Sequence, residues 1–277
     1  MQETNRCEEC VPRYVKREWW ILVEETPKHL RLSVDDKWLV NSKHTRIVNE
    51  SGRLPVYFFP FDEVETSFLK KTDRHFYTEH KGMADVYDID IDGHIIEDAA
   101  WSYPEPEEES VDLKGLVSFV WNKIDHWYEE DEEIFVHPRD PYTRIDTLPS
   151  SRHIEVFLNG KKVADSKRPV ILIERGLTPR YYIPIEDIDQ EFFTPSDRVT
   201  RCPYKGKATY LSANVGGKQY DDIVWSYPDP VPEVIKIKGL YSFYNENVDE
   251  LLVDGEKWEL RKEDRLPYGG PRTDFVI

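Results

Sequence analysis

The feature that most constrains this fold is an internal repeat with an offset of 124 residues. The stretch Trp-Ser-Tyr-Pro at 101–104 recurs at 225–228, and Lys-Gly-Leu at 114–116 recurs at 238–240. The intervening residues align without a gap, so that Lys-Gly at 81–82 falls on Lys-Gly at 205–206. This period is too long for a solenoid repeat and suits a whole small domain. The chain therefore consists of two copies of one domain.

Short runs of β-branched and aromatic residues, separated by turn signals, predict that each copy is built from strands. In the second copy, Ile154–Leu158 and residues 161–164 flank Asn159-Gly160, the strongest short hairpin signal. Further strands are expected at 169–174, 180–184, 208–212, 223–225 and 236–243, with one helical turn within 185–189. Because no segment has a helical pattern of any length, the predicted fold class is mainly β, with two tandem antiparallel β domains.

The repeat and the turn-rich stretches divide the chain into five segments. The apolar run at 19–23 interrupts a polar N-terminus and predicts an added strand or a plug that docks on one domain. Pro138 and the Pro-Ser-Ser stretch at 149–151 mark the boundary between the copies. The expected segments are an N-terminal extension (1–27), a first β domain (28–137), a linker (138–151), a second β domain (152–262) and a C-terminal tail (263–277).

Charge and cysteine content restrict the partners and the compartment. The formal net charge of −17 argues against a nucleic-acid partner and an anionic membrane surface. No apolar run approaches the ~20 residues that span a bilayer. Three cysteines make no disulfide framework, and a cytoplasmic protein is expected. Cys7 and Cys10 have the spacing of half a zinc site, but no second cysteine pair completes it, so no metal is predicted.

The motifs of the second copy, in their order and spacing, resemble those of the domain-of-unknown-function family 427. They are Ala-Asp-Ser at 164–166, Glu174, Tyr-Tyr-Ile-Pro at 181–184, Cys-Pro-Tyr-Lys-Gly at 202–206 and Trp-Ser-Tyr-Pro at 225–228. The first copy resembles the family more weakly, since it keeps Glu50, Tyr57 and Lys-Gly but lacks the Ala-Asp-Ser and Cys-Pro-Tyr motifs.

This resemblance implies a compact domain similar to the β-tent folds. Relatives in that group commonly hold zinc on two cysteine pairs, which neither copy contains. The family has also been described as nucleotidyltransferase-like, a chemistry that needs a Gly-Ser turn followed by a metal-binding Asp-x-Asp pair. The second copy has no such arrangement, and the alternating acids of the first copy, at 88–92, follow no glycine-rich phosphate loop.

Glu174 is the leading catalytic candidate, because a carboxylate that ends an aliphatic strand can have a raised pKa suited to proton transfer. An exposed strand-end acid or a structural hydrogen bond is the alternative. Lys205 and Tyr181 are the other catalytic candidates, and Lys205 could instead pair with Asp165 or Glu174.

Aromatic and polar residues of the same copy could form the walls of a pocket around Glu174. Trp225 and Tyr227 should share one face of their strand, since they are two residues apart. The alternative for these rings is core packing, for Cys202 an inert buried thiol, and for Asp165 a turn anchor. The predicted binding residues are Tyr182, Cys202, Trp225, Tyr227 and Asp165.

These observations favour a small-molecule-binding protein or a cofactor-independent enzyme, of the proton-transfer, isomerisation, cyclisation or lyase type. No cofactor is predicted, because neither a Rossmann nor a P-loop signature is present. The alternatives are a non-catalytic protein-interaction module that uses the acidic surface and Trp19-Trp20, and a nucleotidyltransferase-like activity. The expected partner is a small molecule, and a homo-oligomer is compatible with the sequence.

Overall fold

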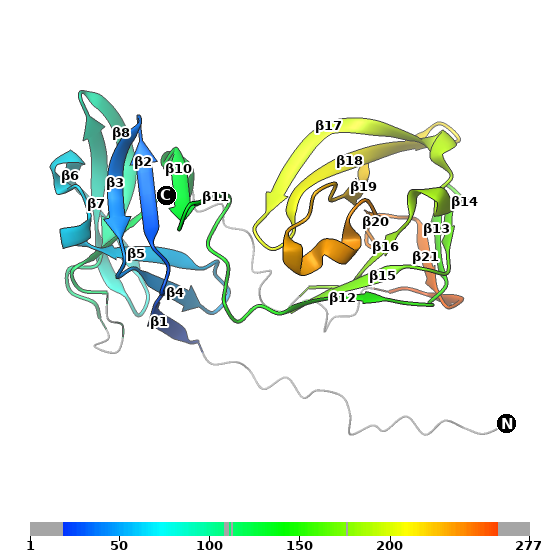
Figure 1. Ribbon diagram of the computed structural model, residues 1–277, viewed down its shortest axis with the longest axis horizontal. Helices are drawn as coiled ribbons and strands as arrows, with labels where there is room; N and C mark the ends of the chain where they lie inside the picture. The colour runs from blue at the N-terminus through cyan, green and yellow to red at the C-terminus, as the bar shows by residue number, and fades with distance from the viewer. Residues whose placement is uncertain (1–18, 108–110, 112, 176, 260–277) are drawn as a thin grey trace, which may run out of the picture.

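The computed structural model describes residues 19–107, 111, 113–175 and 177–259, which form two β-rich domains joined by an extended connection (Figure 1). Cys7, Cys10 and the C-terminal tail at 263–277 lie outside the described residues. Each domain contains one seven-stranded and one four-stranded antiparallel sheet. Among the described residues every helix is a short 3₁₀ helix, which confirms the mainly β prediction.

The first domain has the strand orders β1-β4-β5-β9-β8-β7-β6 and β11-β10-β2-β3. Its seven-stranded sheet consists of β1 (Ile21–Glu25), β4 (Arg46–Glu50), β5 (Val56–Pro60), β6 (Leu69–Thr78), β7 (Gly82–Ile91), β8 (His94–Ser102) and β9 (Leu116–Phe119). The four-stranded sheet consists of β2 (Leu30–Val34), β3 (Lys37–Ser42), β10 (His126–Glu129) and β11 (Glu132–Ile134). The short helices are η2 (Phe61–Glu63), η3 (Thr66–Phe68) and η4 (Trp121–Lys123).

The second domain repeats this topology strand for strand, with the orders β12-β15-β16-β20-β19-β18-β17 and β14-β13-β21-β22. The larger sheet consists of β12 (Ile145–Pro149), β15 (Val170–Glu174), β16 (Arg180–Ile183), β17 (Phe193–Cys202), β18 (Gly206–Val215), β19 (Lys218–Ser226) and β20 (Tyr241–Phe243). The smaller sheet consists of β13 (Ile154–Leu158), β14 (Lys161–Ser166), β21 (Glu250–Val253) and β22 (Glu256–Lys257). The short helices are η5 (Ile185–Asp187), η6 (Gln190–Phe192) and η7 (Pro232–Ile237). The duplication is therefore structural as well as sequential.

The β13–β14 hairpin forms at Asn159-Gly160 as predicted, and β2–β3 is the equivalent hairpin of the first domain. Asn159 and Gly160 have φ values of 46° and 73°, and Asp35 and Asp36 have 48° and 59°. Two consecutive positive φ values are the requirement of a type I′ turn, which matches the twist of the flanking strands.

The sheets extend beyond the boundaries expected from the repeat. β1 pairs with β4, so the first sheet begins at Ile21, within the predicted N-terminal extension. β12 pairs with β15 and places residues 145–149, expected to be part of the linker, in the second sheet. Both edge strands stand at equivalent positions, one on each domain.

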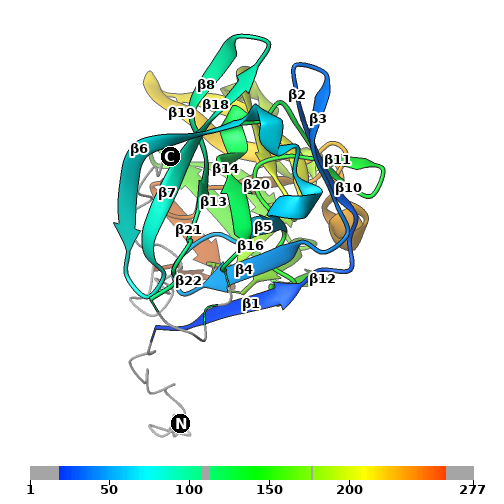
Figure 2. The same cartoon turned by 90° about the vertical axis from the view of Figure 1, so that its left-hand side faces the viewer.

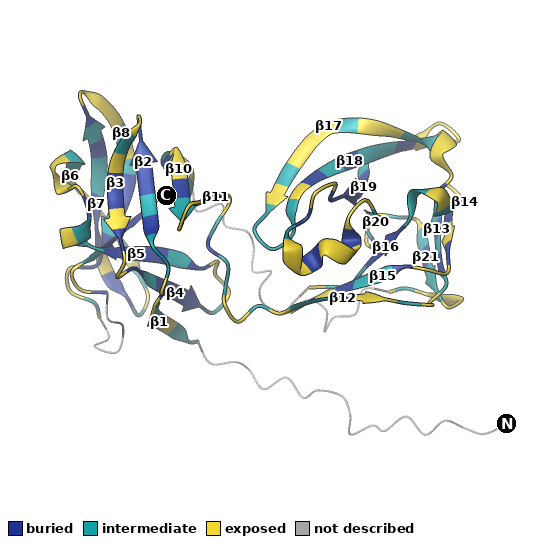
Figure 3. Ribbon diagram, in the orientation of Figure 1, coloured by how far each residue is buried: buried dark blue, intermediate teal, exposed yellow. Residues whose placement is uncertain are grey.

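Each domain has its main core between its two sheets. In the second domain, Val156 and Leu158 of the small sheet pack with Ile183 and Val224 of the large sheet. Seen along the long axis, the sheets of the first domain face each other, with β2–β3 on one side and β6–β8 on the other (Figure 2). Strand residues accordingly alternate between buried and exposed along much of each sheet (Figure 3).

A second core lies on the opposite face of the larger sheet of the second domain. The sheet curves so that β17 and β18 arch over η7 (Figure 1), and Val234 and Ile237 of η7 pack against Tyr210 and Leu172. The predicted strand at 236–243 is therefore partly wrong, because η7 extends to Ile237 and β20 begins at Tyr241. Pro232 at the first helical position favours this helix start. The helical turn expected within 185–189 is confirmed as η5.

Candidate functional site

Glu174 lies at the end of β15 on the face that carries the second core. Along β15 the side chains alternate, so that Leu172 and Glu174 are buried while Ile173 is 42% exposed. This period of two places the Glu174 carboxylate beside the aromatic residues under η7 rather than in bulk water. Ionised carboxylates are rarely buried without a partner.

The partner is Lys205, at the tip of the β17–β18 hairpin. The Lys205 N–H donates to Cys202 O over 3.2 Å, and the Lys205 carbonyl accepts from Val231 N over 3.2 Å. Gly206 follows with a φ of +102°, and a Cβ atom there would lie 3.1 Å from Asp229 O. A glycine is therefore required where the hairpin tip meets the 229–231 segment, and this contact fixes the backbone that carries Lys205.

The Lys205 ammonium donates to Glu174 Oε2. The two side chains are only 12% and 8% exposed, so both charges are largely removed from water. Desolvation of such a pair offsets most of its Coulomb attraction, and apolar residues of similar volume are often as stable. Stability alone is therefore a weak reason for this pair to stand in an aromatic core.

The first domain contains an equivalent pair, in which Lys81 donates to Glu50 Oε2. There the carboxylate has two additional partners: Trp19 Nε1 donates to Oε1 over 3.1 Å, and Arg53 Nε lies 3.4 Å from Oε2. Burial lowers the pKa of Lys81, while Glu50 opposes that shift. The Trp19 indole also stacks on His80, so the N-terminal segment covers the pair.

In the described part of the second domain these two additional partners have no counterpart, since the aligned positions of Trp19 and Arg53 hold Thr143 and Leu177. The Thr143 hydroxyl donates to Asp140 Oδ2 over 2.9 Å. Glu174 thus keeps the lysine of the duplicated pair without the indole and guanidinium that accompany Glu50.

Three predicted binding residues form an aromatic cluster, and two of them, Tyr182 and Tyr227, lie within reach of the Glu174 charge. Trp225 Nε1 donates to Tyr182 Oη over 2.9 Å, with the rings perpendicular at a centroid distance of 6.2 Å. The Tyr182 and Tyr227 centroids are 6.5 Å apart. Trp225 and Tyr227 lie on one face, as predicted. Burial is the main cause of the raised pKa of both tyrosine hydroxyls, and the charge of Glu174 adds to it. Both hydroxyls therefore stay protonated beside the carboxylate.

Two further residues close the site from the interdomain side. Tyr204 lies one residue before Lys205, and its hydroxyl accepts from Asp140 N over 2.6 Å. Burial raises the pKa of Tyr204 to about 12. The charges of Asp140 and Glu174 add to this rise, and hydrogen bonds with Asp140 and Thr143 oppose it. The His137 ring lies 6.1 Å from the Tyr204 ring and donates from Nδ1 to Pro138 O over 2.6 Å. Burial lowers the pKa of His137, against the opposing charge of Glu174.

Sequence reasoning did not assign roles to these two residues. Tyr204 belongs to the Cys-Pro-Tyr-Lys-Gly motif, so its place beside Lys205 was a usable signal. His137 precedes the second domain, and no local pattern connects it with a hairpin tip more than sixty residues later.

The remaining predicted site residues divide into one that joins the cluster and two that do not. Cys202 is a partly buried free thiol that packs against the aromatic cluster. Tyr181 packs in the core between the two sheets, because it is adjacent to Tyr182 and so faces the other side of β16. Asp165 lies on β14 in the smaller sheet, where its carboxylate contacts His153 over 2.7 Å and Lys162 rather than Lys205. The structure thus places Tyr181 and Asp165 outside the Glu174 site.

A cleft of ≈ 220 Å³ lies between the domains, lined by Trp20, Leu22, Asp140, Tyr142 and Arg175. Arg175 follows Glu174 in the chain, and Asp140 is the residue whose N–H binds Tyr204. Tyr142 Oη bridges to Glu24 of β1 over 2.7 Å. The cleft wall is therefore directly bonded to residues that enclose the buried pair.

Comparison with known proteins agrees with this duplicated architecture. Residues 22–130 and 146–254 each match the family model of a domain of unknown function, DUF427. The chain belongs to the DUF427 family. Both matches begin close to the edge strands β1 and β12, so each DUF427 domain includes the strand before its main hairpin. No curated protein matches the chain.

The alternating acids of the first DUF427 domain are bound by separate partners. Asp88 pairs with Arg74 and accepts from Asp98 N, Asp90 accepts from Gly93 N over 3.0 Å, and Asp92 pairs with Lys37. These contacts give each carboxylate a structural role in a strand or turn. Among the described residues, no helix has the length and apolar character that crossing a membrane requires.

Proposed function

We propose that the second DUF427 domain binds a small polar molecule next to Glu174 and Lys205, and that this pair transfers a proton to or from it without a cofactor. The observation that carries the proposal is a largely buried acid–base pair set among tyrosine hydroxyls. In such a low-dielectric setting, a carboxylate can accept a proton and an ammonium can donate one with little solvent reorganisation.

Comparison of the two domains supports the assignment to the second one. Trp19 and Arg53 complete the environment of Glu50, so an incoming group would have to displace them. Thr143 and Leu177 leave the aligned surroundings of Glu174 without those groups. The interdomain cleft adjoins this site through Arg175 and Asp140, and is the proposed approach for the ligand.

Native mass spectrometry of the full chain, combined with a thermal-shift screen of small carboxylic acids, ketones and amines, tests the proposal. The expected result is a ligand that the parent chain and Glu50→Gln bind equally and that Glu174→Gln binds at least tenfold more weakly. Glu50→Gln is a matched control because it changes the same pair in the other domain. Equal effects of the two substitutions on binding would contradict a single working site.

A protein-interaction role is the second candidate, favoured by two exposed apolar residues near one edge of the larger sheet, on the edge strand β12 and its neighbour β15; they are called the edge residues below. Leu148 of β12 and Ile173 of β15 are 49% and 42% exposed on neighbouring strands. Trp19 is already engaged with Glu50, so this role would rest on the edge residues instead. Replacement of both edge residues by Ser would abolish partner or self-association without affecting Glu174-dependent binding.

The proposal includes a cytoplasmic location, which the low cysteine content favours.

A further inference from the structure

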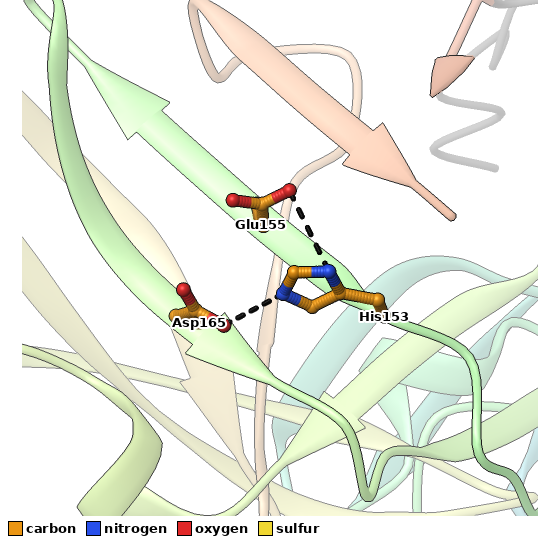
Figure 4. Close-up of side chains that lie close together, drawn as sticks. All are labelled: His153, Glu155 and Asp165. Carbon is orange, nitrogen blue, oxygen red and sulfur yellow. Dashed lines mark hydrogen bonds and ion pairs between the residues drawn. The ribbon is translucent and has the colours of Figure 1, made fainter. Parts of the chain in front are cut away.

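We propose that the smaller sheet of the second domain carries a binding site for a divalent transition-metal ion such as Zn²⁺, formed by His153, Glu155 and Asp165 (Figure 4). This site is separate from the Glu174 pair, which lies on the larger sheet. Each of the three residues offers one ligand atom, and these atoms all lie within 4.8 Å of one another.

The sheet register is what brings the three side chains together. His153 immediately precedes β13 and is two residues before Glu155, and its ring lies on the face of the sheet that carries the Glu155 carboxylate. Glu155 is the direct cross-strand partner of Asp165 on β14. The β13–β14 ladder holds Glu155 opposite Asp165, and the Asp254 N–H, which donates to His153 O over 2.8 Å, fixes the backbone of His153.

The imidazole ring of His153 lies between the two carboxylates, and each of its nitrogens faces one of them (Figure 4). His153 Nε2 lies 2.7 Å from Asp165 Oδ1, and His153 Nδ1 lies 3.7 Å from Glu155 Oε2. His153 N donates to Asp254 Oδ1 over 2.9 Å, which places a third carboxylate at the base of the histidine. Ligand atoms around tetrahedral zinc lie roughly 3.3 Å apart. The widest pair in this cluster, at no more than 4.8 Å, therefore needs to close by at most about 1.5 Å.

A cation already bridges the two carboxylates. Lys162 Nζ lies 2.5 Å from Asp165 Oδ2 and 3.1 Å from Glu155 Oε1, between two of the proposed ligands. The lysine side chain is 42% exposed, so it can swing into solvent when a metal ion takes its place. The Lys162 ammonium therefore competes with a metal ion for the two carboxylates and can be displaced by it.

The donor chemistry defines the class of ion. Imidazole together with two carboxylates suits zinc and its first-row neighbours, whereas magnesium and calcium prefer oxygen ligands alone.

The first domain provides an internal control for this site. The positions aligned with the three proposed ligands hold His29, Arg31 and Asn41. Arg31 places a guanidinium over Trp38 and binds Asp131 over 2.9 Å, so a fixed cation stands where Glu155 stands in the second copy. The second domain thus has an anionic donor set at this sheet position, whereas the equivalent residues of the first domain include a cation and cannot bind a metal ion.

Isothermal titration of the full chain with Zn²⁺ tests the proposal. Cys7 and Cys10 are replaced by Ser in every variant, because thiolates are strong zinc ligands. We expect one equivalent to bind, Asp165→Asn to weaken binding at least tenfold, Lys162→Met to strengthen it several-fold, and His29→Gln to leave it unchanged.

Two results would overturn the site. One is a zinc affinity that Asp165→Asn leaves within twofold of the parent value. The other is the absence of saturable binding in both the parent and the Lys162→Met chains. Co²⁺ substitution gives a second readout, since its visible spectrum reports nitrogen and oxygen ligation and should be lost with Asp165→Asn and kept with His29→Gln.

Discussion

Removal of the lysine from each buried pair should destabilise the two domains to different extents. Lys205→Met leaves the Glu174 carboxylate, 8% exposed, without its ammonium partner. Breaking a buried pair in this way costs about 3–5 kcal/mol, because an uncompensated charge remains in the core. Lys81→Met leaves Glu50 with Arg53 at 3.4 Å and the indole of Trp19 at 3.1 Å. A hydrogen bond to a charged group contributes about 1.5–3 kcal/mol, so the expected cost falls to about 1–3 kcal/mol.

The double substitution Glu174→Leu with Lys205→Met separates the charge effect from simple loss of packing. Both charges are then absent and the volume is retained, so the free energy of unfolding should return to within about 1 kcal/mol of the parent value. The coupling between the two single substitutions is therefore expected to be about 3 kcal/mol or more.

The assay must report each domain separately, because a two-domain chain need not unfold in one step. Amide hydrogen exchange of peptides from β15 and from β4 gives the local opening free energy in each domain. The reasoning is refuted if Lys205→Met lowers the protection of β15 by less than Lys81→Met lowers that of β4, or if the double variant shows the sum of its single effects.

Three further predictions concern individual contacts of the second domain. Gly206→Ala should cost about 1–3 kcal/mol more than Gly217→Ala in thermal unfolding, because both have positive φ but only Gly206 faces a backbone atom at 3.1 Å. Trp225→Phe should cost about 1–3 kcal/mol in urea unfolding, since it removes the indole donor of a fully buried tyrosine hydroxyl. The hydrogen bond from the Tyr220 hydroxyl is the main cause that lowers the pKa of Asp249 to about 2. The ionised Asp249 carboxylate therefore stabilises the folded state above its ordinary pKa of 3.8, and this stabilisation is lost as the pH falls toward 2. Tyr220→Phe should raise that pKa, as measured by NMR titration.

Much of the fold follows from local signals that the structure retains. The offset of 124 residues predicted two equivalent domains, and Asn159-Gly160 predicted a type I′ hairpin because both residues accept positive φ. Glu174 and Lys205 were singled out separately, and their pairing was foreseen only as one alternative, because a hairpin must fold back over the sheet before they meet.

The sequence-based predictions were wrong where the surroundings of a residue are formed by several elements that are distant in the sequence. The helix η7 was predicted as part of a strand, since its apolar residues fill a space that exists only when β17 and β18 curve over it. Tyr181 was grouped with its neighbour Tyr182, although the two-residue period of a strand separates them onto opposite faces. The same period, applied to the hairpin that carries Asp165, would have placed His153 beside it.

Duplication explains why two costly buried ion pairs persist in one chain while their surroundings differ. A pair needed only for stability could be replaced in either copy by apolar residues at little cost. The first copy has instead supplied Glu50 with an indole and a guanidinium, which satisfy the carboxylate and occupy the space around it. The second copy has Glu174 and Lys205 near the protonated hydroxyls of Tyr182 and Tyr227 and beside the interdomain cleft. The proposed function predicts such divergence, and the divergence makes each residue of the first domain the matched control for its counterpart in the second.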